Sequence, residues 1–237
     1  MNSKTKIAIL AGGKGKRFLP YSLVIPKPLM PINETPIIKY LINSFKKYRF
    51  NNFIISSGYK SDLIKSYLGK GKKLGVNIQF LDEKKPLGTA GPLYQIKKKI
   101  KKNDYFFLIN GDIFTKLNFS KLIKFAKKGD YELVVAYVNR NQKNNYGVIN
   151  ISNNKVNSII EKPTSKYSIN AGIYVIKNSA NLTKISKNQF FTMPKLINLY
   201  LSKKINVGAY KINEFWTSIE NVDNLQETEK KINNFIK

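Results

Sequence analysis

The sequence predicts an α/β fold in which helices flank a mixed, mostly parallel sheet, followed by a second half richer in strands. In the first half, short apolar runs alternate with segments whose apolar residues recur every three or four positions, as in strands connected by helices. In the second half, short apolar runs follow one another with Asn-rich turns between them. At 237 residues and 42% hydrophobic content, without an obvious linker, the chain fits one domain.

The first half supplies four predicted strands, at residues 7–10, 52–56, 78–81 and 105–110. The helices predicted between them cover residues 37–48, 61–68 and 91–100. Pro36 suits the first turn of the first helix, and Glu34 or Thr35 is its candidate cap.

The second half supplies five predicted strands, at residues 131–138, 147–151, 156–161, 171–176 and 207–211. We expect them to extend the sheet and to form a wall beside the site. A closing helix is predicted over residues 221–237, because apolar or small side chains recur there at helical spacing, at Leu225, Thr228, Ile232 and Ile236.

A glycine-rich turn follows the first strand. Gly12, Gly13 and Gly15 lack the side chains that keep a phosphate from the backbone, so their N–H groups can bind one. Arg17 and Lys27 are the candidate cations beside it. The spacing matches neither the dinucleotide fingerprint nor the P-loop, and the alternative is a tight turn whose glycines serve geometry alone.

Ligands of open α/β sheets bind beyond the carboxyl ends of the strands, so residues 10–17, 81–91 and 110–112 are expected to converge. Asp112 follows the buried strand 105–110, where a carboxylate can hold Mg²⁺. The alternative is an Asp that caps the next element.

Composition limits the chemistry. The chain has no Cys and no His, which excludes disulfides, thiolate catalysis and histidine bases, so any metal must be held by oxygen. A net charge of +28 suggests nucleic acid or an anionic membrane surface, but the lysines are spread evenly among many Asn and Ile. We therefore expect no membrane partner and a charge that attracts anionic substrates, and nucleic-acid binding stays open as a disfavoured alternative that only the charge supports. Without a leader or a long apolar run, a cytoplasmic protein is expected.

The stretch Leu10-Ala-Gly-Gly-Lys-Gly-Lys-Arg-Phe-Leu-Pro20, followed by Pro26-Lys-Pro-Leu29, resembles the signature of sugar-1-phosphate nucleotidylyltransferases. Further similar pieces follow in the order of that family, at residues 86–91, 110–112, 146–149, 161–163 and 170–174. The segment 191–197 resembles short members that make GDP-sugars, including glucosamine-1-phosphate and mannose-1-phosphate guanylyltransferases.

The resemblance implies a Rossmann-like, GT-A-like sheet with a nucleotide-binding half at residues 1–115 and a sugar-binding half with the closing helix at 116–237. It implies that a sugar 1-phosphate attacks the α-phosphorus of an NTP, giving an NDP-sugar and pyrophosphate, with Mg²⁺, or alternatively Mn²⁺. GTP is favoured. Four alternatives stay open. The nucleotide could be UTP, CTP or dTTP, and the acceptor could be a phosphate other than a sugar phosphate. The chain could be a nucleotide-sugar-binding protein with weakened turnover, and it could form a homo-oligomer.

The resemblance also assigns roles to residues. Arg17 and Lys27 are expected to be catalytic, and Asp112 to hold the metal. The expected nucleotide-binding residues are Leu10, Ala11, Gly12, Gly13, Gly15, Gly88 and Thr89. The expected sugar-phosphate residues are Asn110, Gly147, Glu161, Lys162, Asn170 and Gly172.

Two positions depart from the family pattern. Ser218 stands where the family has a second metal-binding Asp, and a neutral hydroxyl is a poor ligand for Mg²⁺. Glu220 is the candidate substitute, because alternate residues of an extended segment point the same way. Lys16 replaces the Thr that usually precedes the Arg, and adds a cation near the phosphates or points outward.

Overall fold

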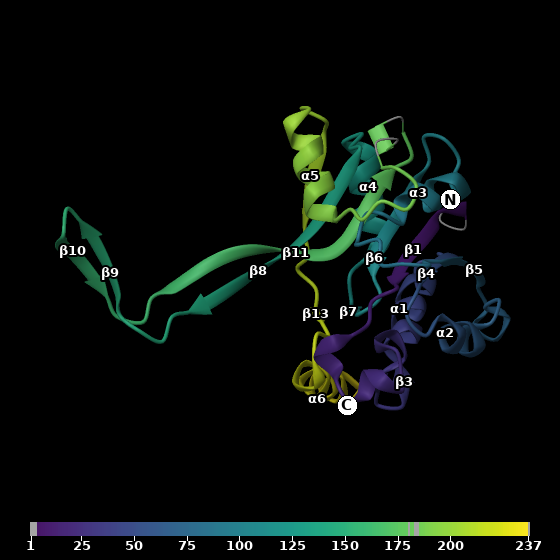
Figure 1. Cartoon of the computed structure of the whole chain (residues 1–237), viewed down its shortest axis with the longest axis horizontal. Coiled ribbons are helices and arrows are strands. Elements are labelled where there is room, and N and C mark those ends of the chain that lie inside the picture. The colour runs from purple at the N-terminus through teal and green to yellow at the C-terminus, as the bar shows by residue number, and fades with distance from the viewer. Residues whose placement is uncertain (1–3, 180, 183–184, 237) are drawn as a thin grey trace.

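A seven-stranded sheet forms the centre of the protein in the computed structural model, which describes residues 4–179, 181–182 and 185–236 (Figure 1). Across the sheet the strands are ordered β12 (Val207–Lys211), β8 (Leu133–Lys143), β11 (Thr164–Lys177), β6 (Tyr105–Asn110), β1 (Lys6–Ala11), β4 (Asn52–Ser57) and β5 (Asn77–Asp82). Only β11 runs antiparallel to its neighbours β6 and β8. The other neighbouring pairs are parallel, so the predicted mostly parallel mixed sheet is confirmed.

Helices cover both faces of this sheet. The helices are α1 (Ile37–Lys46), α2 (Ser61–Leu68), α3 (Leu93–Ile96), α4 (Phe119–Lys128), α5 (Met193–Ser202) and α6 (Val222–Ile236). In β1, Ile7 and Ile9 pack in one core with residues of α1, α2 and α4, whereas Ala8 packs in a second core with α3 and α5. This alternation is what a strand buried on both faces requires. None of the described helices is long and apolar enough to cross a membrane.

Helix α1 shows why the periodic segments fold as predicted. Ile38, Leu41, Ile42 and Phe45 recur at helical spacing and are all buried in the first core. Its predicted start at residue 37 is confirmed, but the expected cap by Glu34 or Thr35 was wrong, because Pro36 is the N-cap and no side chain caps the helix. Residues 35–36 instead form β3 (Thr35–Pro36), which pairs with β2 (Pro31–Ile32).

The closing helix α6 brings the end of the chain to the loop that follows β1. Ile232 is buried in a third core with Phe18, Ile32 and Ile219. The helix predicted over 221–237 is confirmed from residue 222, while residue 237 lies outside the described residues. A short antiparallel pair, β7 (Ile113–Thr115) with β13 (Trp216–Ser218), links this region to the end of β6.

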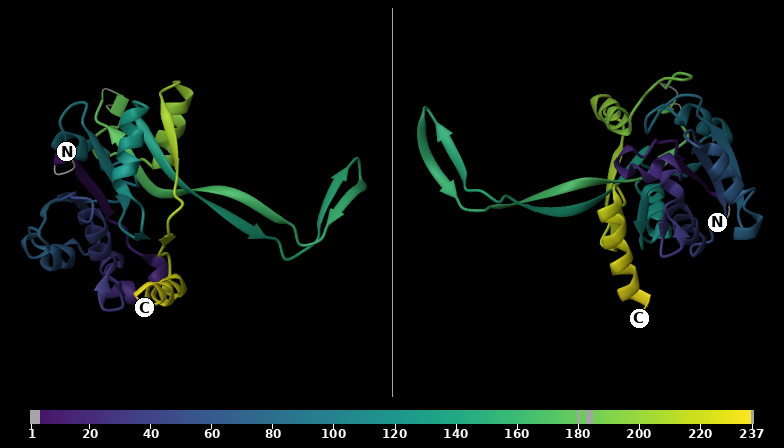
Figure 2. Two further views of the ribbon diagram at one scale, coloured as in Figure 1. Left: turned by 180° about the vertical axis from the view of Figure 1, so that it is seen from behind. Right: turned by 60° about the horizontal axis from the view of Figure 1, so that its bottom comes forward.

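An arm projects from the body of the protein (Figures 1 and 2). Strands β8 and β11 stay paired beyond the sheet, over Asn139–Lys143 and Thr164–Ser168, and end in the hairpin of β9 (Val148–Ser152) and β10 (Lys155–Ile160). Residues 139–143 and 164–170 are exposed, whereas the parts of β8 and β11 inside the body are mostly buried. The strands predicted here exist, but β8 and β11 are longer than predicted, and residues 139–169 do not form the expected wall beside the site.

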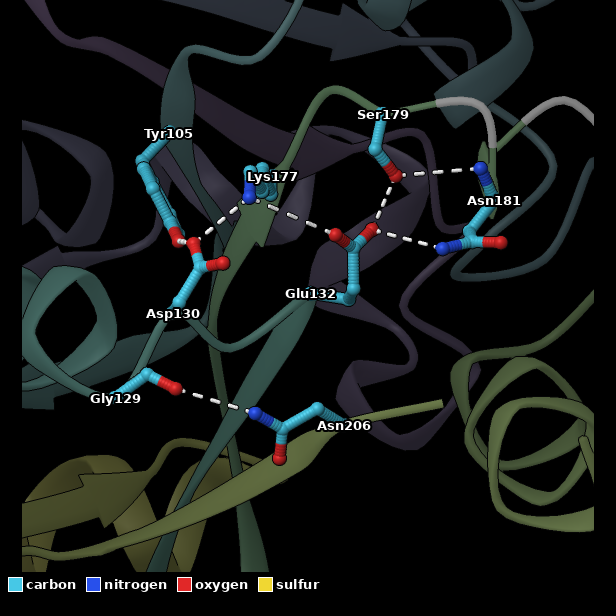
Figure 3. Close-up of polar contacts among 8 residues, drawn as sticks. All are labelled: Tyr105, Gly129, Asp130, Glu132, Lys177, Ser179, Asn181 and Asn206. Carbon is cyan, nitrogen blue, oxygen red and sulfur yellow. Dashed lines mark hydrogen bonds and ion pairs between the residues drawn. The ribbon is translucent and has the colours of Figure 1, made fainter. Parts of the chain in front are cut away.

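A polar network closes the opposite end of the sheet, where β6 and β8 begin and β11 ends (Figure 3). Nζ of Lys177 lies 2.7 Å from Oδ1 of Asp130 and 3.8 Å from Oε1 of Glu132. The hydroxyl of Tyr105 donates to Asp130 at 3.0 Å, and Nδ2 of Asn181 donates to Glu132 at 3.1 Å. This network ties together the starts and ends of three strands far from the carboxyl ends of β1 and β6.

Candidate active site

A cavity of about 460 Å³ opens at the carboxyl ends of β1 and β6. Residues from 10–17, 83–89 and 110–112 contribute to its wall, so the predicted convergence of these segments is confirmed. The residues that line the cavity are Leu10, Ala11, Gly12, Gly13, Gly15, Lys16, Arg17, Lys27, Pro28, Glu83, Pro86, Gly88, Thr89, Asn110, Gly111, Asp112 and Glu220.

The glycine turn after β1 leaves one side of this cavity without side chains. A Cβ added at Gly13 would meet no atom within 4 Å, so the space beside this backbone is open. Gly15 has a φ of 62°, a conformation that favours glycine. On the neighbouring strand end, a Cβ added at Gly111 would lie 2.7 Å from the carbonyl oxygen of Leu10. The turn therefore has the exposed backbone that a bound phosphate needs.

Lys27 and Asp112 form an ion pair in the wall of the cavity. Nζ of Lys27 lies 2.5 Å from Oδ2 of Asp112, and the two side chains are only 15% and 25% exposed. The ammonium group also lies 5.6 Å from the centre of the Phe18 ring. Oδ1 of Asp112 is buried and has no hydrogen-bond partner among the residues that the structure describes. Since a buried carboxylate oxygen without a partner is unfavourable, this atom gains from a bound cation.

Arg17 and Glu220 form a second ion pair, which is more exposed. Nη1 of Arg17 donates to Oε2 of Glu220. Pairing of β13 with β7 brings Glu220 to the cavity, and the N–H of Ile219 donates to the carbonyl oxygen of Asp112 at 2.9 Å. Both predicted phosphate cations, Arg17 and Lys27, are therefore paired with carboxylates.

The loop that the resemblance assigns to the nucleobase is held against the segment before α5. The N–H of Ala90 donates to the carbonyl oxygen of Phe191, and the N–H of Phe191 donates to that of Leu87, both at 2.9 Å. Gly88 has a φ of 71°, and a Cβ added there would lie 2.6 Å from the Phe191 carbonyl oxygen. The hydroxyl oxygen of Thr89 accepts from the N–H of Met193, the first residue of α5, at 2.8 Å, and no side chain caps α3.

Glu83 is a residue of the cavity that sequence reasoning missed. The hydroxyl of Ser56 donates to its Oε1 at 2.8 Å, and burial raises the pKa of Glu83. A Cβ added at Gly12 would lie 2.9 Å from the same oxygen, so the carboxylate packs against the glycine turn. Its place two residues after the predicted strand 78–81 was the available signal, since ligands of such sheets bind beyond the carboxyl ends of the strands.

Asn110 lines the cavity, and the predicted residues Asn170 and Gly172 lie beside it. A Cβ added at Gly172, whose φ is 68°, would lie 2.6 Å from Nδ2 of Asn110. Asn170 accepts from the N–H of Gly172 at 2.9 Å and donates to the Tyr174 hydroxyl at 2.7 Å. Asn170 therefore holds the bend of β11, and Asn110 is the residue of this group in the cavity wall.

Gly147, Glu161 and Lys162 lie in the arm and are absent from the cavity lining. Oε2 of Glu161 would lie 3.0 Å from a Cβ added at Gly147. Nζ of Lys162 lies 3.7 Å from Oε1 of Glu161, and both side chains are exposed. The three residues thus cluster with one another, and their expected contact with a sugar phosphate stays a prediction.

Comparison with known proteins identifies the family. The family model described as nucleotidyl transferase matches residues 6–234. The chain belongs to the nucleotidyl transferase family. Similar solved structures include HddC from Yersinia pseudotuberculosis, at a TM-score of 0.76 and 26% identity over 96% of this chain and 99% of that one. A putative glucose-1-phosphate thymidylyltransferase from Bacillus anthracis superposes with a TM-score of 0.78 at 23% identity, over 96% and 94% of the two chains, which shows a shared fold.

Curated relatives of this chain carry more specific names. The mannose-1-phosphate guanylyltransferase catalytic subunit beta of Xenopus tropicalis is 30% identical over 90% of this chain and 61% of its own length. The mannose-1-phosphate guanyltransferase of Yarrowia lipolytica is 32% identical over 89% of this chain and 59% of its own length. The chain thus spans about three fifths of the length of these relatives.

The carboxylates of this chain offer few ligands for a metal. Among the described residues, no group of three or more Asp and Glu side chains is placed to share an ion. Asp112, with its buried Oδ1, and Glu220 are the carboxylates of the predicted metal site, and Glu220 is bound to Arg17. This set fits Mg²⁺, which usually takes one or two protein carboxylates together with water and substrate phosphates.

Ser218 lies in β13 opposite Ile113, half-buried and outside the cavity lining. Glu220, two residues further on, does line the cavity. The expectation that Glu220 reaches the site face is confirmed, while its role as a metal ligand stays a prediction. Lys16 also lines the cavity, beside Arg17.

Proposed function

We propose that this chain transfers the guanylyl group of GTP to a sugar 1-phosphate, releasing pyrophosphate and a GDP-sugar. The observation that carries the proposal is the meeting of a glycine turn, Lys27, Arg17 and Asp112 in one cavity at the strand ends. Such a site suits a reaction between two anions, because fixed cations and backbone dipoles counter the charge that brings them together.

The chain has no histidine, and the proposed reaction does not need one. An oxygen of the sugar phosphate is already an anion; it forms a bond to the α-phosphorus while the bond from that phosphorus to the β-phosphate oxygen breaks. The electron pair of the broken bond leaves with pyrophosphate. The task of the protein is then to align the two phosphates and to stabilise the charge that moves to the leaving group.

In this proposal the glycine turn and Arg17 bind the triphosphate, and Lys27 exchanges Asp112 for a phosphate oxygen. Asp112, with Oδ1 already buried and without a partner in the described chain, would hold the metal. Bound Mg²⁺ would supply positive charge between the phosphates. Gly88 and Thr89 lie on the loop held by Phe191, on the side of the cavity proposed for the base.

The names of the relatives support guanine as the base and mannose 1-phosphate as the first sugar to test. UTP, CTP and dTTP, and other sugar or alcohol phosphates, are the alternatives within the same chemistry. Mg²⁺ is the proposed ion, with Mn²⁺ as its replacement.

A matrix of nucleoside triphosphates against sugar 1-phosphates, scored by pyrophosphate release, tests the proposal. We expect the highest kcat/KM with GTP and a hexose 1-phosphate, dependence on Mg²⁺, and loss of activity in Asp112→Asn. Leu63→Ala, on the exposed face of α2, is the matched control and keeps full activity. Saturable GTP binding without pyrophosphate release for any acceptor would contradict the proposal and indicate a binding protein.

A further inference from the structure

The hairpin at the tip of the arm is more apolar on one face, its apolar face, than on the other. In β9, Ile149 and Ile151 are two residues apart and therefore point to the same side. Ile149 is paired with Ile159 and Ile151 with Val156, so all four side chains share that face. Each is exposed, up to 65% for Val156.

A β-bulge decides which isoleucine of β10 joins this face. Val156 and Ile159 are three residues apart, a spacing that places side chains on opposite faces of a regular strand. The register of β10 shifts between Val156 and Ser158, which inserts one residue and returns Ile159 to the side of Val156. Ile160 then lies on the opposite face, where it is paired with Val148, so four apolar side chains share one face and two share the other, and all six are exposed.

The arm is a poor candidate for folding back on its own body. Arg140 to Lys143 remain paired with Thr164 to Tyr167, in a two-stranded ladder that continues the central sheet outward (Figure 2). To bring the hairpin onto its own cavity, the chain would have to turn back sharply at residues 144–147 and 161–163, which join this ladder to the hairpin. A two-stranded hairpin without a third layer is only marginally stable in water, so the apolar face needs a surface to pack on.

The body of the same chain exposes a second apolar patch. Between Arg17 and Lys27, which both line the cavity, the loop exposes five large apolar side chains: Leu19, Tyr21, Leu23, Val24 and Ile25. Val24 is 69% exposed. One chain therefore carries an apolar hairpin face and an apolar rim beside its cavity, which are the two surfaces that a reciprocal contact between two copies requires.

Glu161 lies beside the apolar face of the hairpin, so it would move together with that face. A Cβ added at Gly147 would lie 3.0 Å from Oε2 of Glu161 and 3.3 Å from Cδ1 of Ile159, so the carboxylate and the isoleucine flank the same point. The rim of the cavity is rich in cations, including Lys16 and Arg17. Docking of the hairpin would thus bring a carboxylate to a basic surface, in a chain that has only 14 acidic residues.

We propose that two copies of this chain exchange arms, the apolar face of each hairpin packing on the 19–25 loop of the other and delivering Glu161 and Lys162 to its cavity. The evidence for the exchange itself is the pair of exposed apolar patches, on the hairpin and on the 19–25 loop. The delivery of Glu161 and Lys162 to bound sugar phosphate rests on the proposed function.

Sedimentation of the full chain over a dilution series tests the exchange. We expect a species of twice the 27.2 kDa mass of one chain. Ile151→Lys with Val156→Lys on the hairpin, and separately Leu23→Lys on the loop, are expected to give monomers. Leu63→Lys, an exposed leucine on α2, is the matched control and stays dimeric. Ile151→Thr with Val156→Thr replaces the charged pair if circular dichroism shows that it fails to fold.

A native chain that is monomeric at every concentration, or a dimer that survives both sets of substitutions, would overturn the exchange. These outcomes do not depend on activity. If the native dimer forms without any pyrophosphate release, the proposed function fails while the exchange stands.

Mixing two inactive variants tests the delivery of Glu161. A chain with Asp112→Asn still offers an intact arm, and a chain with Glu161→Gln still offers an intact cavity. Unfolded and refolded together in equal amounts, they are expected to regain about a quarter of the native activity, because half the dimers are mixed and each mixed dimer has one complete site. No recovery from a mixture that sedimentation shows to be dimeric would overturn the delivery.

Discussion

Nζ of Lys27 and Oδ2 of Asp112 lie 2.5 Å apart in the cavity wall, although 85 residues separate them in the sequence. The pair joins the predicted phosphate cation to the predicted metal carboxylate, so each balances the charge of the other. A triphosphate attracts Lys27 and a divalent cation attracts Asp112, and a metal-bound nucleotide therefore replaces one ion pair with two favourable contacts. Binding of nucleotide and metal should consequently be coupled.

Asp112→Asn is expected to lower kcat by about 10²–10³-fold, the usual effect of losing one electrostatic contact to a transition state. The amide keeps an oxygen that can accept from Lys27, so the fold is expected to survive. Steady-state pyrophosphate release gives kcat, and circular dichroism checks the fold. Unchanged turnover would remove Asp112 from the mechanism.

Lys27→Met tests how much the ion pair of Lys27 with Asp112 contributes to stability. It leaves the Asp112 carboxylate partly buried without its cation, and we expect a loss of about 1–3 kcal/mol in the free energy of unfolding. The double variant Lys27→Met with Asp112→Asn is expected to recover part of that loss, as measured by urea denaturation. If the double variant is as unstable as the sum of both single variants, the two groups are not energetically coupled.

Glu220→Gln tests whether the second carboxylate holds Arg17 or a metal. The Arg17–Glu220 pair is largely exposed, so the free energy of unfolding is expected to change by less than about 0.5 kcal/mol. Releasing Arg17 is expected to lower the KM for GTP. Asp82→Asn, which breaks the exposed pair with Lys65, is the matched control and should leave the KM unchanged. A rise in the Mg²⁺ concentration needed for half-maximal rate would instead assign Glu220 to the metal.

The sequence predicted the sheet because its signals are local. The apolar runs of β1 and β6 and the helical spacing of apolar residues in α1 predict which residues are buried. A continuous apolar run is typical of a strand buried on both faces, as in the centre of a parallel sheet. The cavity followed from the same reasoning, since Gly12, Gly13 and Asp112 all come directly after strands. Side-chain contacts between segments far apart in the sequence could not be predicted from local patterns. Glu83 is held by Ser56, and Glu220 reaches Arg17 only because β13 pairs with β7.

The arm marks the limit of the local signals. The short apolar runs at 147–151 and 156–161 predicted two strands, and both exist as β9 and β10. Whether that hairpin covers its own cavity depends on how far the β8–β11 ladder continues before it bends. The length of this ladder depends on the pairing between β8 and β11, and the spacing of residues within either strand does not predict it.

Gly88→Ala is expected to damage the fold, and Gly13→Ala only the binding of nucleotide. An alanine Cβ at Gly88 would lie 2.6 Å from the Phe191 carbonyl oxygen at a φ of 71°, so the free energy of unfolding should fall by about 1–3 kcal/mol. At Gly13 the methyl group meets no atom within 4 Å and occupies open space beside the turn. We expect native stability with a raised Kd for GTP, measured by calorimetry. Native GTP affinity in Gly13→Ala would exclude this turn from the phosphate site.

The network around Lys177 is expected to support the fold over a defined pH window (Figure 3). Its hydrogen bond to Asp130 raises the pKa of Lys177 above its ordinary 10.5, and the same bond lowers the pKa of Asp130 below its ordinary 3.8. The contribution of Lys177 is therefore complete below pH 10.5 and is lost as the pH rises through its raised pKa. That of Asp130 is complete above pH 3.8 and is lost as the pH falls through its lowered pKa.

Lys177→Met is thus expected to destabilise the chain by a nearly constant amount across neutral pH, and by less toward the acid end where Asp130 becomes protonated. Urea denaturation of native and variant chains at a series of pH values measures the difference. Asp130→Asn should remove the acid dependence while leaving the pair of Lys177 with Glu132, which lies 3.8 Å away. Lys65→Met, which breaks an exposed pair on α2, is the control and should show little change at any pH. A Lys177→Met effect that grows as the pH falls through the acid range would contradict the assignment, because a protonated Asp130 has no charge left to stabilise.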